Sequence, residues 1–338
     1  MTAGRASPPP TLAEHLRALQ SGSPPLAPSV LTVLETLSDT GARLAREIAG
    51  AALTGGLGET GDVNPHGDRV RRLDVLANEL LLAALQRSGV VSVVASEELE
   101  APAVWPRAAG TDSLSVCLDP LDGSLNTNVA GVLGTIFGIR PGPDPREPDP
   151  ARAVLGTGSR QVATGYVLYG PATVSVYAPG ARVNAFVLDR ADDRFRLTLA
   201  DARPPAAGRT YAVNDANWPR WGPGSRALIE ELRPARDGDV RYSLRYSGAM
   251  VADFHRTLVE GGIYLYPEDV DRPEGRIRLL YEAAPLALVA ETAGGRASTG
   301  RTRILDVVAT HYHQRTPCYI GSAEEVARAE RCLREGRG

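Results

Sequence analysis

The sequence contains no lysine, since all 37 basic residues among its 338 residues are arginine. This absence excludes a Schiff-base aldolase, a pyridoxal-phosphate lysine and the lysine of a nucleotide-binding P-loop. Cysteine is scarce as well: Cys117, Cys318 and Cys332 show neither Cys-x-x-Cys nor Cys/His spacing. We therefore expect no disulfide framework, no zinc site and a reducing cytoplasm as the location.

Long apolar runs and a strong charge excess are also missing. No apolar run reaches 18 residues, and the first ten residues lack the basic and apolar regions of a signal peptide, so we predict no membrane contact. A formal net charge of −3 argues against nucleic-acid binding. Hydrophobic residues make up 43% and charged residues 23%, which is typical of a soluble globular protein. The length fits two domains or one large α/β unit.

The helices predicted for the first part of the chain lie before residue 87. Two proline clusters within residues 1–28 indicate a poorly ordered arm with at most one short helix, around residues 11–20. Apolar spacing predicts amphipathic helices over 30–52 and 70–86. The glycine-dense stretch 55–67 between them is expected to be a loop, and loops of this length are usually functional or mobile.

Strands are predicted from residue 90 onward, followed by a mixed region. The expected strands cover 90–95, 115–118, 161–168, 173–176, 183–188, 194–199, 305–308 and 319–320. Residues 141–155 read as a surface loop. The expected helices cover 225–232, 249–260, 277–293 and 323–333.

The stretch from Asp119 to Ser124 carries the strongest chemical signal. Asp119 and Asp122 lie three residues apart on a proline-stiffened turn and can face one point. Gly123 then lets the backbone approach a ligand, and the following amides can face an anion. Hard oxygen ligands followed by phosphate donors suit a Mg²⁺–phosphate site, although Asp-Pro-x-Asp-Gly is also a common turn sequence.

Four further acidic residues are candidates with ordinary alternatives. Glu97 and Glu98 follow a buried apolar strand and repel each other unless a cation or solvent relieves them. Asp74 lies near the start of a predicted helix, where it could simply interact with the helix dipole. Glu282 interrupts an apolar helix and needs a partner, either a metal ion or Arg278 four residues earlier.

Taken together, these motifs resemble the class I fructose-1,6-bisphosphatase family. The match runs from about Gly61 to Ala327, and several independent motifs occur in the right order. A lone Asp-Pro-x-Asp-Gly would point only to the wider lithium-sensitive phosphatase superfamily. The matching stretches are 72–78, 96–98, 118–124, 134–138, 163–170, 247–253, 275–285, 305–308 and 313–315.

The resemblance implies an α/β, layered αβαβα sugar-phosphatase fold and a homotetramer. It implies a metal- and phosphate-site domain over 29–200 and a sugar-phosphate-binding domain over 201–338, after a flexible arm over 1–28. The implied activity is Mg²⁺-dependent hydrolysis of the 1-phosphate of fructose 1,6-bisphosphate, in gluconeogenesis or carbon fixation. Two or three Mg²⁺ ions would serve each subunit, with Mn²⁺ as an alternative.

The resemblance also implies a role for individual residues. Glu97, Asp119, Asp122 and Glu282 would bind metal together with the Leu121 carbonyl. Asp74 and Glu98 would activate the attacking water, and Asp68 would lie on a mobile loop that closes over the site. The implied substrate contacts are Gly123 and Ser124 at the 1-phosphate, Asn214, Tyr246, Tyr266 and a neighbouring subunit's Arg245 at the distal phosphate, backbone at Gly248 and Met250 at the sugar, and the basic side chains Arg276 and Arg278.

Some positions depart from the family pattern. Arg276 replaces a lysine, Leu125 replaces a serine of the phosphate motif and Asn128 replaces a carboxylate. Sedoheptulose 1,7-bisphosphate is an alternative substrate, and an inositol or nucleotide phosphate is a further one. A catalytically weak paralogue that binds sugar phosphates is the non-enzymatic alternative.

Overall fold

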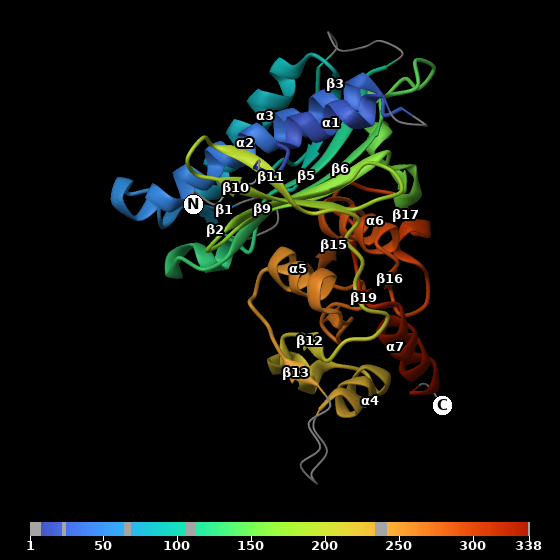
Figure 1. Ribbon diagram of the computed structural model, residues 1–338. Helices are drawn as coiled ribbons and strands as arrows, with labels where there is room; N and C mark the ends of the chain where they lie inside the picture. Colours follow the sequence, from blue (N-terminus) through green and yellow to red (C-terminus); the bar gives the residue numbers. More distant parts are fainter. Residues whose placement is uncertain (1–7, 22–24, 64–68, 106–111, 234–241, 337–338) are drawn as a thin grey trace.

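The molecule alternates helices and sheets in five layers (Figure 1). The computed structural model describes residues 8–21, 25–63, 69–105, 112–233 and 242–336. A helical layer covers one face of a large sheet, a second helical layer separates that sheet from a smaller one, and two helices cover the far side. The expected layered αβαβα fold is confirmed.

The outer helical layer contains α1 (Leu12–Gln20), α2 (Pro28–Thr54) and α3 (Arg72–Ser88). Both long helices end at a glycine in the left-handed conformation, Gly55 and Gly89, where a side chain would be strained. The predicted helices 30–52 and 70–86 are therefore confirmed with shifted ends.

The N-terminal segment packs against the fold. Thr11 caps α1: its hydroxyl accepts the Glu14 N–H at 3.3 Å, and Glu14 accepts the Thr11 N–H at 2.7 Å. Leu12 and Leu16 are buried in the same cluster as α2 and β11. The short helix expected around residues 11–20 is therefore confirmed, and its two buried leucines pack it against the fold, unlike a poorly ordered arm.

The large sheet has the strand order β11-β10-β9-β8-β6-β5-β3-β4. Neighbours are antiparallel except β3 and β5, which run parallel with Ser96 opposite Leu118. Residues that follow β3 and residues at the end of β5 therefore meet at one edge of the sheet. The strands are β3 (Val91–Ser96), β4 (Ala103–Val104), β5 (Leu114–Asp122), β6 (Leu133–Pro141), β8 (Ala163–Tyr169), β9 (Thr173–Ala178), β10 (Asn184–Asp189) and β11 (Arg194–Leu199).

Helices α5 (Met250–Glu260) and α6 (Ala284–Thr292) form the layer between the sheets, and both contact strands of each. The second sheet has the order β13-β12-β14-β19-β16, and α4 (Pro223–Leu232) and α7 (Ala323–Glu335) pack on its other side. Its strands are β12 (Thr210–Ala212), β13 (Ser243–Leu244), β14 (Ile263–Tyr266), β16 (Arg296–Ser298) and β19 (Cys318–Gly321).

Four local expectations differ from the structure. The glycine-dense stretch contains β1 (Glu59–Val63), which pairs with β2 (Arg69–Arg71). The expected helix 277–293 begins as β15 (Ile277–Arg278) paired with β18 (Arg315–Thr316), passes through a π-helical turn at Leu279–Ala283 and becomes helical only at α6. The expected strand 305–308 is mostly a 3₁₀ turn, Ile304–Asp306, before β17 (Val308–Ala309) pairs with β7 (Gly156–Thr157). The expected surface loop 141–155 ends in a 3₁₀ turn that buries Val154.

Two absences concern the described part of the chain. The cysteines Cys117, Cys318 and Cys332 are buried and form no disulfide with one another. No helix among the described residues is long and apolar enough to cross a membrane.

Candidate active site

The site begins where β5 ends. Asp119 and Asp122 lie in the last four residues of this strand, where the register of its pairing with β6 shifts. Both carboxylates are buried, and Asp119 accepts the Leu121 N–H at 3.0 Å. The Pro120 carbonyl accepts the Thr135 hydroxyl at 2.9 Å, which ties the turn to β6. The proline-stiffened turn predicted from the sequence is therefore a distorted strand end.

Glu282 joins these two aspartates from the π-helical turn. One carboxylate oxygen from each of Asp119, Asp122 and Glu282 lies within 4.8 Å of the other two. These three residues are called the carboxylate cluster below. Glu282 accepts the backbone N–H of Arg278 at 2.6 Å. The other residues of this π-helical turn are buried, and Glu282 is the one whose side chain joins the cluster.

Glu97 reaches the same edge because β3 and β5 are parallel. Its N–H donates to the Leu118 carbonyl at 3.0 Å. The Arg278 guanidinium, whose side chain is only 5% exposed, donates to Glu97 Oε1 at 3.1 Å. Arg278 is thus the guanidinium partner of Glu97, while Glu282 receives only its backbone N–H. The arginine alternative raised for Glu282 therefore applies to Glu97 instead.

The cluster is electrostatically strained without a cation. Burial raises the pKa of Asp119 well above its usual value, and repulsion from Glu97, Asp122 and Glu282 adds to the shift. Burial also raises the pKa of Asp122 to about 7, against the N–H of Val251 that donates to it at 2.7 Å. The pKa of Glu282 rises for the same two reasons, burial first and then repulsion from Glu97 and Asp122. Clustered hard oxygens that repel each other fit a divalent cation such as Mg²⁺.

Asp74 lies on the first turn of α3 and is 4% exposed. Burial raises its pKa to about 6, although nearby Arg71 opposes the shift and donates its backbone N–H to the carboxylate. Asp74 Oδ1 is buried and has no hydrogen-bond partner in the described part of the chain. The hydroxyl of Ser96 donates to Asn78 at 2.8 Å, which fixes α3 against the end of β3, just before half-buried Glu98. Asp68 lies outside the described residues.

The loop after Asp122 has a fixed backbone. Gly123 has φ +79°, and a Cβ there would come within 2.5 Å of the Ala249 Cβ, so only glycine fits. Ser124 begins a 3₁₀ turn, Ser124–Val129, and its hydroxyl accepts Arg71 Nη1 at 3.0 Å. Leu125, which replaces the family serine, is 77% exposed.

Two residues without a role in the sequence analysis hold this loop to its neighbour. Asn126 Nδ2 donates to the carbonyls of Val132 at 3.0 Å and Ser247 at 3.1 Å. Asp253 accepts the Ser247 N–H with both oxygens, at 3.0 and 3.2 Å. Only Asp253 had a signal in the sequence, because it lies inside the matched stretch 247–253, whereas Asn126 lies just beyond 118–124.

The turn that Asp253 holds presents two of the expected sugar contacts. Gly248 adopts φ +83°, and Met250 starts α5 with its side chain buried. The next N–H, from Val251, donates to Asp122, so the turn is joined directly to the carboxylate cluster. The structure thus brings the expected sugar and metal positions together.

The expected distal-phosphate residues are placed on the second sheet. Tyr246 is 39% exposed, and burial followed by the electrostatic influence of Tyr266 and Asp253 raises its pKa. Tyr266 is the last residue of β14 and is half-buried. Asn214 follows β12, and Arg245 is exposed with its guanidinium donating to the Leu244 carbonyl. Neither of the last two contacts the carboxylate cluster within the described residues.

Arg276 is held by an aspartate that the sequence analysis missed. Its guanidinium donates to Asp269 at 3.0 and 3.1 Å, and the Asp269 side chain is only 1% exposed. Asp269 also accepts the N–H groups of Asp271 and Arg272, at 2.9 and 3.0 Å. A buried carboxylate paired in this way fixes the direction of the arginine.

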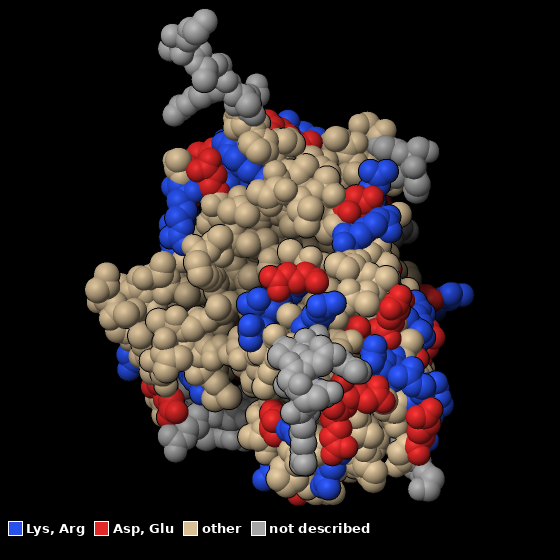
Figure 2. Space-filling model, turned by 60° about the horizontal axis from the view of Figure 1, so that its bottom comes forward, with Lys and Arg blue, Asp and Glu red and all other residues tan. Residues whose placement is uncertain are grey.

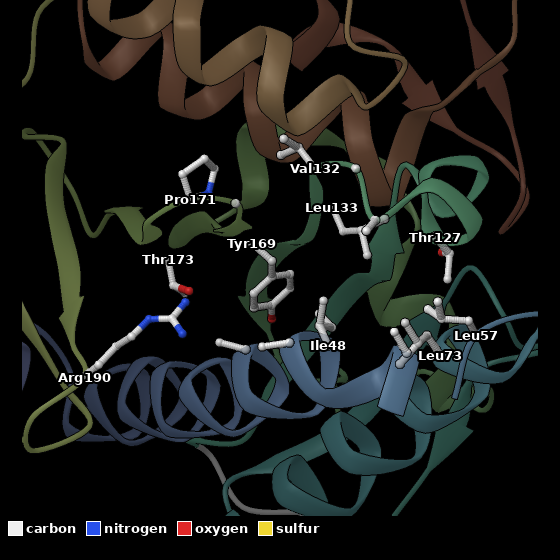
Figure 3. A pocket seen from close by; sticks show the side chains of 16 residues that line it. Ile48, Leu57, Leu73, Thr127, Val132, Leu133, Tyr169, Pro171, Thr173 and Arg190 are labelled. Carbon is white, nitrogen blue, oxygen red and sulfur yellow. The ribbon is translucent and has the colours of Figure 1, made fainter. Parts of the chain in front are cut away.

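A separate cavity of about 440 Å³ lies between α2 and the large sheet (Figure 3). Ile48, Leu133 and Tyr169 give it an apolar wall, and Arg190 reaches toward Thr173 at one side. None of the clustered carboxylates lines it. On the face drawn in Figure 2, acidic and basic side chains are interspersed and no single sign of charge dominates.

The layered fold and the buried carboxylates at its strand ends are those of a sugar phosphatase. A solved Leishmania major fructose-1,6-bisphosphatase, described as the holo form, superposes with a TM-score of 0.88 at 33% identity, covering 97% of this chain and 100% of that one. The family models for the fructose-1,6-bisphosphatase N-terminal and C-terminal domains match residues 11–200 and 204–334.

Curated relatives agree. A class 1 fructose-1,6-bisphosphatase of Nostoc punctiforme is 43% identical over 328 residues, 96% of this chain and 93% of the relative. One of Synechococcus elongatus is 43% identical over 327 residues, 96% of this chain and 94% of the relative. The chain belongs to the class 1 fructose-1,6-bisphosphatase family, which confirms the resemblance seen in the sequence.

Proposed function

We propose that the protein hydrolyses the 1-phosphate of fructose 1,6-bisphosphate to fructose 6-phosphate and inorganic phosphate. The observation that carries the proposal is the carboxylate cluster of Asp119, Asp122 and Glu282 beside a glycine turn and Ser124. Family membership with high coverage supports the choice of substrate.

Mg²⁺ is the proposed cofactor, two or three ions per subunit, with Mn²⁺ as the alternative. Glu97, Asp119, Asp122, Glu282 and the Leu121 carbonyl would hold it. When bound, the metal would neutralise phosphate charge and lower the pKa of a water molecule. Glu97 also forms an ion pair with Arg278, so its carboxylate would have to bind the metal and the guanidinium at the same time.

Asp74 suits the role of general base. Its pKa of about 6 leaves it ionised yet still basic near neutral pH, and its Oδ1 has no protein partner in the described residues. As the water oxygen bonds to phosphorus, the bond from phosphorus to the sugar oxygen breaks. The water proton passes to Asp74 or Glu98, and the sugar oxygen takes a proton from solvent. Asp68 is proposed to assist this step.

Substrate contacts are proposed at both ends of the sugar. Gly123 and Ser124 would bind the 1-phosphate, and backbone at Gly248 and Met250 would contact the sugar. The distal phosphate would be bound by Asn214, Tyr246, Tyr266 and a neighbouring subunit's Arg245. Arg276 and Arg278 are proposed as further substrate contacts. The exposed position of Arg245, which forms no ion pair within the described part of its own chain, supports the proposed homotetramer.

The location, the pathway and the division into domains are proposed from family membership. We assign the enzyme to the cytoplasm and to gluconeogenesis or, since the named relatives are cyanobacterial, the Calvin cycle. We also propose the division into residues 29–200 for metal and phosphate binding and 201–338 for sugar-phosphate binding. Five of the metal and water-activating acids lie in the first part, and Glu282 lies in the second.

The test is phosphate release from fructose 1,6-bisphosphate and sedoheptulose 1,7-bisphosphate, with Mg²⁺ and with a chelator. We expect chelator-sensitive release from the fructose substrate. Asp119→Ala should abolish it, since a ligand at the centre of the cluster is lost, whereas Arg245→Ala should raise KM and leave the Mg²⁺ requirement unchanged. Faster release from the seven-carbon sugar would change the substrate. Tight binding without turnover would favour the sugar-phosphate-binding paralogue.

A further inference from the structure

Arg71 is a buried cation at the phosphate loop. It is the last residue of β2 and precedes α3, and it is 9% exposed. Its Nη1 donates to Ser124 Oγ at 3.0 Å, and its Nε is buried with no acceptor in the described part of the chain. Among the described residues, no carboxylate forms an ion pair with it.

A guanidinium in this setting has no carboxylate partner among the residues that the structure describes. Burying a charge without a partner is costly, because the lost hydration is not replaced. Asp74 is close enough for Arg71 to oppose the rise in its pKa, yet Asp74 Oδ1 and Arg71 Nε are each buried without a partner. The two side chains therefore do not satisfy each other, and one vacant donor and one vacant acceptor lie beside the phosphate loop.

The position of Ser124 indicates which anion would complete the arrangement. Its hydroxyl keeps the guanidinium directed to the loop that follows Asp122 and Gly123. The backbone of this loop is fixed by the contact between Gly123 and Ala249. A planar guanidinium with free donors matches the geometry of phosphate oxygens better than that of a single water.

We propose that Arg71 binds the phosphoryl group that is hydrolysed, donating through Nε while Ser124 holds the guanidinium in place. The inference rests on the proposed function and deepens it, since it adds a side-chain cation from the start of α3 to the phosphate site. Asp74 Oδ1 then remains available for the attacking water. Arg71 thus supplies positive charge on the phosphoryl oxygens opposite the carboxylate cluster.

The experiment compares Arg71→Gln and Arg71→Lys with Arg72→Gln. Arg72 is the adjacent arginine, exposed, and its guanidinium donates to the Gly55 carbonyl at 2.7 Å, so it provides a matched control. Binding of inorganic phosphate in saturating Mg²⁺ is measured by calorimetry. KM for fructose 1,6-bisphosphate, the Mg²⁺ activation constant and the melting temperature are measured beside it.

We expect Arg71→Gln to weaken phosphate binding and raise KM about tenfold or more, as for loss of one charged hydrogen bond. Arg71→Lys should fall between it and the wild type, and Arg72→Gln should match the wild type. The Mg²⁺ activation constant should not move. Equal phosphate affinity in the two glutamine variants overturns the proposal, and so does an effect on Mg²⁺ alone, which would make Arg71 a counter-charge to the acids.

The two proposals fail separately. Wild-type protein that binds phosphate but does not hydrolyse fructose 1,6-bisphosphate would refute the proposed function, and the calorimetric comparison would still decide the role of Arg71. If Arg71→Gln lowers the melting temperature, Arg71→Lys is compared with the wild type instead. Its retained positive charge would preserve part of the affinity for phosphate only if Arg71 contacts phosphate.

Discussion

At the scale of single residues, Asp253 shows how a buried carboxylate holds a binding loop at an energetic cost. It accepts the Ser247 N–H with both oxygens, and it is 3% exposed. Burial raises its pKa to about 6, above the unfolded value near 4, against the lowering effect of the bonds from Ser247. The folded protein therefore binds this proton more tightly than the unfolded chain does.

This difference predicts a pH-dependent effect of Asp253→Asn in the metal-free protein. The protonated group favours the fold below about pH 4, and this advantage is lost as pH rises through about 6. Asparagine resembles the protonated form at every pH and still accepts one N–H. The stability of the wild type relative to Asp253→Asn should fall by on the order of 1–3 kcal/mol between pH 4 and 7.5.

Urea unfolding at several pH values measures that difference. Exposed Asp112 provides the matched aspartate-to-asparagine control, because it lies away from the turn. A stability difference between wild type and Asp253→Asn that stays constant with pH would mean that burial does not raise the pKa of this carboxyl above its unfolded value.

Sequence reasoning found individual acids and missed the residues that arrange them. Asp119, Asp122 and Glu282 could be predicted because carboxylates in these motifs are typical metal ligands. In the structure, one carboxylate oxygen of each lies within 4.8 Å of the others. Asn126 and Asp269 could not, because an amide or a carboxylate in a turn is common, and its partner becomes visible only when distant loops meet. Spacing reports which residues are local neighbours and carries no information about those contacts.

At the scale of elements, amphipathic helices and central strands could be predicted, and elements shaped by tertiary context could not. β6 was missed because its run, Leu133–Pro141, contains two glycines and is buried up to Arg140, with no alternation to mark it. The segment after Ile277 was expected to be helical because its apolar spacing is continuous, but pairing with β18 and the π turn override that preference. Burial on both faces removes the periodicity on which such predictions rest.

The docking of α1 makes a prediction at this scale. Leu16 is fully buried between α1, α2 and the edge of the large sheet, so Leu16→Ala should cost about 2–5 kcal/mol of stability. Leu53 on α2 is 91% exposed and gives a matched leucine-to-alanine control, whose cost should stay within about 0.5 kcal/mol. Thermal unfolding gives the ranking, and hydrogen exchange of the α1 amides locates the loss. Equal effects of the two substitutions would show that α1 contributes no packing energy.

At the scale of the whole molecule, the carboxylate cluster lies between the large sheet and the helical layer that separates it from the second sheet. Asp119 and Asp122 end a strand of the large sheet, and Glu282 precedes α6, the helix that contacts both sheets. The N–H from Val251 of α5 to Asp122 adds a second link across the same boundary. A cation bound by these residues would therefore join parts of the chain that fold around separate sheets.

The raised pKa values of the cluster predict that Mg²⁺ binding releases protons. Asp122 has a pKa of about 7, and those of Asp119 and Glu282 are raised by burial and mutual repulsion, so protons compete with the metal near neutral pH. Affinity for Mg²⁺ should rise from pH 6 to 8, about tenfold per pH unit for each proton displaced. Calorimetric titration in two buffers of different ionisation enthalpy counts the protons released. Glu282→Gln should release fewer protons than the wild type, because one competing carboxylate is gone. Mg²⁺ binding that is independent of pH, with no proton release at pH 6.5, would mean that the cluster is already ionised and that solvent or a nearby cation stabilises it without the metal.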